Sequence, residues 1–229
     1  MSAVTWLLVT LAAYMGAIGV ARRAGNHPLA NPVLLAAVPV VALMLATGTS
    51  HATYAHGGAW LLVFLGPATV ALAVPLYRHW PQVRAAGGPL FLAIGAGSLT
   101  AVGCALALAW GLGAAPNTLV SLAPKSVTTP IAMGIAETSA GLPSLAAAIV
   151  IVTGVVGAVI GPWMLTRLGI QDPRARGAAL GTAAHGIGTA RAFQESAETG
   201  TFSGAAMGIN GIVTALVLPV LLIWIFAVT

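Results

Sequence analysis

Charged side chains are scarce in this sequence. Nine basic and four acidic residues make up 6% of the 229 residues, whereas 59% are hydrophobic and the mean hydropathy is +0.98. Soluble domains usually carry about 25% charged residues. So few charges cannot cover the surface of a chain of this length. A soluble fold is therefore excluded, and we expect the lipid bilayer to surround most of the surface.

The excess of basic over acidic residues does not indicate nucleic acid. The basic residues form short clusters between apolar runs, as topology signals of membrane proteins do, whereas a nucleic-acid site needs a concentrated basic face. We therefore expect no nucleic-acid partner.

Cysteine and catalytic motifs are also lacking. The one cysteine, Cys104, lies inside an apolar run, which excludes a disulfide framework and a thiolate metal site. His27, His51, His56 and His79 lie in expected loops without metal-ligand spacing, and the common hydrolase and nucleotide motifs are missing. We expect no metal, no cofactor and no enzymatic activity.

Long apolar runs are what the sequence does contain. Six of them approach the roughly 20 residues that a membrane-spanning helix needs. They are Ala3–Ala21, Pro32–Thr49, Gly58–Tyr77, Leu90–Leu112, Ser144–Thr166 and Ser203–Ala227. The sequence thus predicts an all-α polytopic membrane protein with about six transmembrane helices.

Two further segments, Asn117–Leu142 and Arg176–Thr201, differ from these runs. They are rich in Gly, Ser and Thr. Their ionisable side chains are Lys125, Glu137, His185, Arg191, Glu195 and Glu198. Neither segment fits a lipid-facing helix, so each is expected either to cross as a broken helix buried in protein or to form a re-entrant hairpin.

Charge placement favours the re-entrant alternative. Basic residues gather in three connections, Arg22-Arg23, Arg78–Arg84 and Arg167–Arg176, whereas Ser50–Gly57 and Gly113–Asn117 contain no Lys or Arg. With two re-entrant hairpins, all three basic connections fall on the cytoplasmic side, as the positive-inside rule requires. With two full crossings, the last basic connection would lie outside. We predict six spans, two hairpins and both termini outside.

The two polar segments also align with each other weakly. Thr129 aligns with Thr189 and Ser139 with Thr199, and a long apolar run follows each segment. A hairpin plus one span is an odd number of crossings, so the second copy would be inverted, as in many transporters. We expect residues 1–116 to provide scaffold and oligomerisation helices of a homo-oligomer, and residues 117–229 to form the substrate-binding core.

The first polar segment predicts an anion site. Pro124 and Pro130 break any continuous helix, and Thr129 before Pro130 fits an N-cap that starts a short helix ending near Glu137. A helix N-terminus favours a carboxylate. Its neighbours Lys125, Ser126 and Thr128 would add donors. The alternatives are that Lys125 lies at the headgroup level and that Glu137 caps the hairpin instead of coupling a proton or ion.

The second polar segment repeats this plan. Gly186 and Gly188 would permit a break after His185, Thr189 would cap the next helix, and Arg191 would lie in the first turn of Ala190–Ala197. Arg191 can bind a carboxylate at two points. The full predicted substrate site is Lys125, Ser126, Thr128, Thr129, His185, Gly188, Thr189 and Arg191, with Glu137 and Glu195 as candidates for ion or proton coupling.

Purely structural roles for the ionisable residues of the second segment stay open. His185 would be a neutral side chain bonded to the backbone near the break. Arg191 would neutralise Glu137, Glu195 or Glu198. Glu195 and Glu198 would lie in a solvated helix end.

The sequence resembles the LrgB/CidB/YohK family at these residues. The most specific matching stretches are Pro124–Ala132 and Ala175–Gly177 with Gly181–Arg191, and Asn31-Pro32 and Val70–Tyr77 are also similar. The resemblance covers nearly the whole chain. Two positions depart from the pattern, in each case one small residue for another: alanine stands at 184 for serine, and glycine at 186 for alanine.

The resemblance implies two classes of function. One is a carrier of small 2-hydroxy or 2-oxo monocarboxylates such as glycolate, glycerate, lactate or pyruvate, because the family includes the LrgB half of a plant plastid glycolate/glycerate transporter. The other is an antiholin-like regulator of murein hydrolase export and lysis, acting with an LrgA/CidA-type membrane subunit. Interrupted segments with buried cations favour the carrier. We expect it to lie in the cytoplasmic membrane and to bind a small organic anion.

Overall fold

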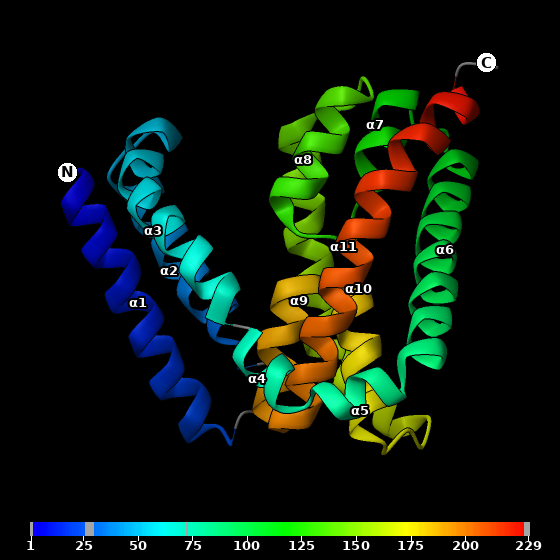
Figure 1. Cartoon of the computed structure of the whole chain (residues 1–229). Coiled ribbons are helices and arrows are strands. Elements are labelled where there is room, and N and C mark those ends of the chain that lie inside the picture. The colour runs from blue at the N-terminus through cyan, green and yellow to red at the C-terminus, as the bar shows by residue number, and fades with distance from the viewer. Residues whose placement is uncertain (1, 26–29, 72, 227–229) are drawn as a thin grey trace. The chain divides into compact units, whose positions relative to one another are not determined.

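A computed structural model describes residues 2–25, 30–71 and 73–226 of the chain. The regular structure in these ranges is entirely helical, as the composition predicts, and Figure 1 shows helices α1 to α11. The chain divides into two compact units, Met1–Pro75 and Leu76–Thr229. The functional division expected after residue 116 is a different one, and it stays a prediction.

The described residues of the first unit include the helices α1 (Ala3–Arg23), α2 (Pro32–Ala46) and α3 (His51–Ala71). Helix α1 packs against both others. Its Trp6 is fully buried and meets Tyr54 of α3 edge to face, with ring centroids 5.6 Å apart. Asn31 caps α2 by accepting a hydrogen bond from the Val33 amide, which satisfies one of the unpaired N–H groups at the helix start.

The second unit contains the longer helices and both polar segments. Helix α4 (Ala73–Arg78) spans the boundary between the units, and seven helices follow: α5 (Trp80–Ala85), α6 (Gly87–Gly111), α7 (Pro116–Leu122), α8 (Thr129–Thr138), α9 (Pro143–Arg167), α10 (Pro173–Glu195) and α11 (Ala197–Phe226). Helix α10 packs mainly against α11 and α9, so the second polar segment lies in the interior of this unit.

Within the described residues, four helices are long and apolar enough to cross a membrane: α1, α6, α9 and α11. They coincide with four of the six predicted spans, although α11 begins at Ala197 and not at Ser203. Helix α2 covers the second predicted span with only 15 residues, about 22 Å at 1.5 Å per residue. The third predicted span, Gly58–Tyr77, falls on α3 and α4, except for residue 72, which lies outside the described residues.

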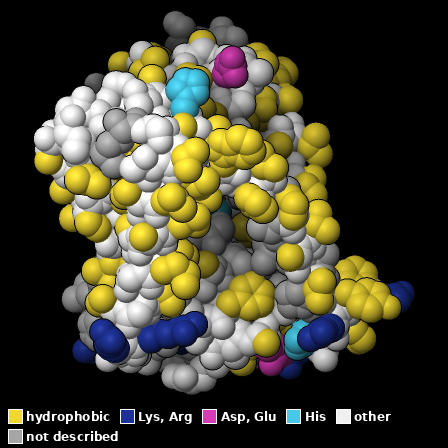
Figure 2. Space-filling model, turned by 90° about the vertical axis from the view of Figure 1, so that its left-hand side faces the viewer, with side chains coloured by type: hydrophobic (Ala, Val, Ile, Leu, Met, Phe, Trp, Pro, Cys, Tyr) yellow, Lys and Arg dark blue, Asp and Glu magenta, His cyan; other side chains and the backbone are white. Residues whose placement is uncertain are grey.

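Apolar side chains of the spanning helices are exposed. Leu92 of α6 is 73% exposed and Leu216 of α11 is 71% exposed. Hydrophobic side chains also lie at the surface of the face in Figure 2. Exposed leucines in this number need lipid as their solvent, so the chain is a multi-pass membrane protein.

Each polar segment is a hairpin followed by a long helix. The first hairpin, residues 116–142, contains α7 and α8 and precedes α9; the second hairpin, residues 173–195, is α10 and precedes α11. Helices α9 and α11 run in opposite directions (Figure 1). The second copy of this hairpin-and-helix unit is therefore inverted relative to the first.

Candidate functional site: the meeting point of two hairpins

The first hairpin returns to the end of the unit where it starts. The hydroxyl of Ser121 accepts a hydrogen bond of 2.7 Å from the Leu142 amide, 21 residues further along, and donates to the Asn117 carbonyl at 2.6 Å. Gly141 lies against Val120, where an added Cβ would come within 2.9 Å of a methyl carbon. The segment thus enters and leaves at one end, as the re-entrant alternative predicts.

The second hairpin also folds back on itself. Ala184 and His185 leave the helical conformation, and His185 has φ 41° and ψ −131°. Arg176 and Glu195 would be about 28 Å apart in a straight helix with a rise of 1.5 Å per residue. Instead, Arg176 Nε lies 2.8 Å from Glu195 Oε2, so the two limbs of α10 run side by side and both ends lie together.

A cluster of bonds ties the base of this hairpin to the end of α9. The guanidinium of Arg176 donates to both carboxylate oxygens of Glu195, at 2.8 and 3.0 Å, and to the carbonyls of Ile170 and Pro162, at 2.9 and 3.3 Å. The hydrogen bonds that Arg176 donates to Glu195 raise the pKa of Arg176, which stays cationic. Glu195 is therefore the ion-pair partner of Arg176, whereas the pairing expected from the sequence was with Arg191, and its side chain is not in a solvated helix end.

The tips of the two hairpins meet at one buried residue, Asn210 of α11. Its Nδ2 donates to the carbonyl of Ser126 in the first tip and to that of Thr182 in the second, each at 3.3 Å. Helix α9 also reaches both tips. Val150 packs in a cluster with Val127, and its carbonyl lies 3.0 Å from His185 Nε2. The oppositely directed hairpins thus end beside each other inside the second unit.

Each tip carries the N-terminus of a half-helix. In the first hairpin the cap residue is Thr128, with φ −68° and ψ 151°, and α8 begins at Thr129. The prediction that Thr129 is the cap is wrong by one residue, because Pro130 occupies the second helical position. In the second hairpin the half-helix runs from Gly186 to Glu195. The two half-helices start at Thr129 and Gly186, which lie 57 residues apart (186 − 129), whereas the sequence alignment pairs Thr129 with Thr189.

Several predicted site residues lie at or beside the first tip. Lys125 is partly buried, and its Nζ donates to the hydroxyl of Ser126 at 3.2 Å. Ser126 is buried, whereas Thr128 and Thr129 are partly exposed. Four residues at or just before the start of α8 therefore carry one cation and three hydroxyls, beside the backbone N–H groups that a helix start leaves without intrahelical partners.

The residues of the second tip have packing roles. His185 is buried and lies within hydrogen-bond distance of a backbone carbonyl, which fits the structural role expected as an alternative to substrate binding. Gly188 packs against Leu180 and Ala184 of the other limb, with no room for a Cβ. Thr189 is not a cap, because its hydroxyl donates back to the His185 carbonyl at 2.9 Å and meets Ser203 at 2.9 Å.

The remaining predicted residues lie further from the tips. Arg191 lies in the second turn of the half-helix from Gly186, not in the first turn of a helix from Ala190, and its Nη1 donates to Gln194 at 2.8 Å. Glu137 is exposed in the last turn of α8, towards the base of the first hairpin. Among the described residues, no cluster of His, Cys, Asp and Glu could hold a metal ion.

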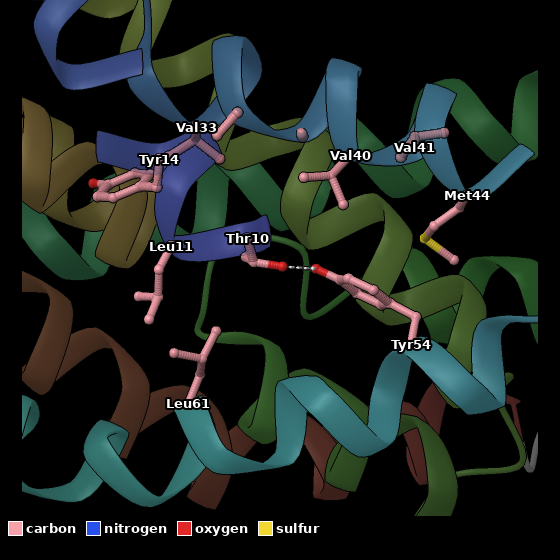
Figure 3. A pocket seen from close by; sticks show the side chains of 11 residues that line it. Thr10, Leu11, Tyr14, Val33, Val40, Val41, Met44, Tyr54 and Leu61 are labelled. Carbon is pink, nitrogen blue, oxygen red and sulfur yellow. Dashed lines mark hydrogen bonds between the residues drawn. The ribbon is translucent and has the colours of Figure 1, made fainter. Parts of the chain in front are cut away.

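A pocket of about 400 Å³ lies elsewhere, within the first unit (Figure 3). Its wall is mainly aliphatic and aromatic, and its polar feature is a contact of 3.3 Å between the hydroxyls of Thr10 and Tyr54. The lining residues that the structure describes include no cation. Its described lining therefore has hydroxyl groups but no positive charge for an anion, and it contains none of the predicted site residues.

Asn210 was missed by sequence reasoning, although a signal was present. It is an amide inside the long apolar run that became α11, and polar residues at membrane depth usually have a specific partner or role. Asn210 is neutral and lies on an intact helix, so neither a charge nor a helix break marks it in the sequence.

Comparison with known proteins agrees with the family resemblance. Residues 10–224 match the model of the LrgB-like family. Two Bacillus subtilis (strain 168) proteins, the uncharacterized proteins YwbG and YxaC, are 37% and 32% identical, over 94% and 98% of this chain and 96% of each relative. The holin-like protein CidB of Staphylococcus aureus (strain Mu50) is 27% identical over 96% of both chains. No solved structure matches. The chain is a member of the LrgB-like family.

Proposed function

We propose that the chain is a secondary transporter of small monocarboxylates, of the glycolate, glycerate, lactate or pyruvate type, in the cytoplasmic membrane. The observation that carries this proposal is the meeting of two inverted hairpins at Asn210, with a half-helix starting at each tip. Inverted repeats with interrupted helices and a substrate site near the membrane midplane are the architecture of many secondary transporters.

The first tip supplies the chemistry for an anion. The Lys125 ammonium donates to the Ser126 hydroxyl, and both residues come shortly before the positive end of α8; each of these groups favours a carboxylate. The hydroxyls of Thr128 and Thr129 suit a 2-hydroxy or 2-oxo group. We place the carboxylate between α8 and the second tip, with Arg191 reaching it from the second turn of its half-helix and Glu137 as a candidate coupling group.

Uptake into proteoliposomes that contain only this protein tests the proposal. We expect labelled glycolate, lactate or pyruvate to enter with a rate that saturates and that unlabelled substrate reduces. Leakage of an uncharged dye without saturable uptake would contradict a carrier and favour a pore.

Arg191→Ala tests the placement of the carboxylate. If Arg191 binds substrate, its loss should weaken affinity by about 1.5–3 kcal/mol, the worth of a hydrogen bond to a charged group, while the protein still folds. Arg174→Ala is the matched control, because Arg174 lies on the same helix and pairs at the surface with Glu198 at 3.4 Å. Unchanged affinity in a folded Arg191→Ala protein would remove this residue from the site.

The second candidate function is that of a holin-like regulator of cell lysis, acting with an LrgA/CidA-type membrane subunit. It is favoured by the name of the CidB relatives, which are called holin-like. In this alternative, dye leakage or lysis would depend on coexpression of the second subunit. A homo-oligomer is compatible with either function, and cross-linking in the membrane would reveal it.

A further inference from the structure

Asn210 occupies an unusual position for a polar side chain. It is 1% exposed and lies in the middle of α11, the longest apolar helix of the chain. A buried amide has two N–H donors and one carbonyl acceptor to satisfy, and lipid provides no partners. Asn210 uses both kinds of group, because Nδ2 donates to Ser126 and Thr182 while Oδ1 accepts from Thr214 at 3.4 Å.

The two carbonyls that Asn210 binds belong to different hairpins. Ser126 lies in the non-helical turn before α8, and Thr182 lies in the last turn before the kink at His185. Backbone carbonyls at such positions lack some of the partners that a continuous helix provides. Since a carbonyl only accepts hydrogen bonds, the amide nitrogen must face both of them. An aspartate here would oppose two carbonyls with a carboxylate, and a leucine would leave both without this donor.

We propose that Asn210 is a positioning residue that joins the two hairpin tips and sets the width of the anion site between them. Its transport consequences rest on the proposed function; its structural role does not. Because α11 continues directly from the second hairpin, the residue also ties the first tip to the helix that carries the second. Loss of the amide should free both tips at once, although they lie 56 residues apart in sequence (182 − 126).

A neighbouring residue provides a matched control. Ser203 is also buried on α11, and its hydroxyl meets Thr189 of the second hairpin at 2.9 Å. The hydrogen bonds described for Ser203 reach only the second hairpin. Ser203→Ala removes a buried hydrogen bond from the same helix, so it separates a general loosening of α11 from a specific link between tips.

Amide hydrogen exchange of the substrate-free protein in nanodiscs tests the link. We expect Asn210→Leu to raise exchange about tenfold in two segments, 123–129 and 181–188, and Ser203→Ala to raise it only in 181–188. If Asn210→Leu does not fold, Asn210→Ala leaves space for water and should give the same two-segment pattern. A folded Asn210 variant that loosens neither segment, or only 181–188, would overturn the proposal.

Transport provides a second readout. In proteoliposomes, Asn210→Ala should raise the KM for the carboxylate about tenfold, with a smaller change in maximal rate, because a wider site binds the anion less well. If the unmodified protein takes up no carboxylate, the proposed function fails, and the exchange pattern alone decides the role of Asn210. If it transports and Asn210→Ala leaves KM unchanged, the amide does not set the width of the site.

Discussion

Removing the carboxylate of Glu195 should loosen the base of the second hairpin. The side chains of Arg176 and Glu195 are only 12% and 17% exposed, and two hydrogen bonds of 2.8 and 3.0 Å join them. Breaking a buried ion pair by removing one partner costs about 3–5 kcal/mol, because the other charge stays buried without compensation. Since both groups retain some access to water, we expect Glu195→Ala to cost about 3 kcal/mol.

Arg176→Ala should cost at least as much as Glu195→Ala. The guanidinium also donates to the carbonyls of Ile170 and Pro162, which would lose their partner together with Glu195. A double variant, Arg176→Met with Glu195→Leu, should recover the part of the loss that comes from an unpaired buried charge, but not the part that comes from the two carbonyls. Such a recovery would show that the two side chains stabilise the protein as a pair and not independently of each other.

Reversible unfolding of the reconstituted protein in denaturant measures these differences. Single variants that each cost less than about 0.5 kcal/mol, as exposed ion pairs do, would refute the reasoning. Glu195→Gln addresses the proposed coupling role separately. If Glu195 carries a proton during transport, this variant should abolish uptake even where the hairpin stays folded; if it serves only the ion pair, uptake should follow stability.

Two further predictions concern packing and topology. Gly181→Ala should destabilise the protein by about 1–3 kcal/mol in the same unfolding assay, because the added Cβ would meet the backbone of Ser203, whereas Gly208→Ala, with open space around it, should be neutral or slightly stabilising. In a Cys104→Ala background, an impermeant thiol reagent added outside should label Thr53→Cys and not Gln171→Cys; labelling of Gln171→Cys from outside would contradict the predicted topology.

The sequence predicts the long helices well because burial in lipid requires long apolar runs. The run Ser144–Thr166 became α9, Pro143–Arg167, with one residue added at each end. The start of α8, the half-helix of the first hairpin, was also predicted to within one residue, since proline next to a threonine restricts the local backbone. Features with a strong local cause were therefore predictable.

The second hairpin was harder to predict because glycine has two uses. Its two glycines after the kink were expected to supply the break, yet the left-handed φ falls on His185, and Gly188 serves close packing against Leu180. A φ of this sign in a non-glycine residue costs about 1–3 kcal/mol, and the bond to the Val150 carbonyl helps to hold it. Sequence alone cannot separate a glycine that bends from a glycine that packs.

Contacts between segments that lie far apart in the sequence could not be predicted, for a different reason. Arg176 can pair with Glu195 only because α10 folds back on itself. Asn210 can bind both hairpins only because their tips lie beside it in the fold. Neither contact leaves a spacing pattern along the chain. The apolar runs and the first helix break were thus predictable, whereas the partners of the buried polar groups required the fold.

Counterflow in proteoliposomes tests the central claim most directly, that two inverted hairpins form a carrier for a small monocarboxylate. Vesicles containing only this protein are loaded with a high concentration of unlabelled glycolate, lactate or pyruvate and diluted into the labelled compound. A carrier with one alternating site predicts transient accumulation of label above its outside concentration, abolished by omitting the internal substrate. Label that only equilibrates, with or without internal substrate, would contradict the carrier and indicate a pore.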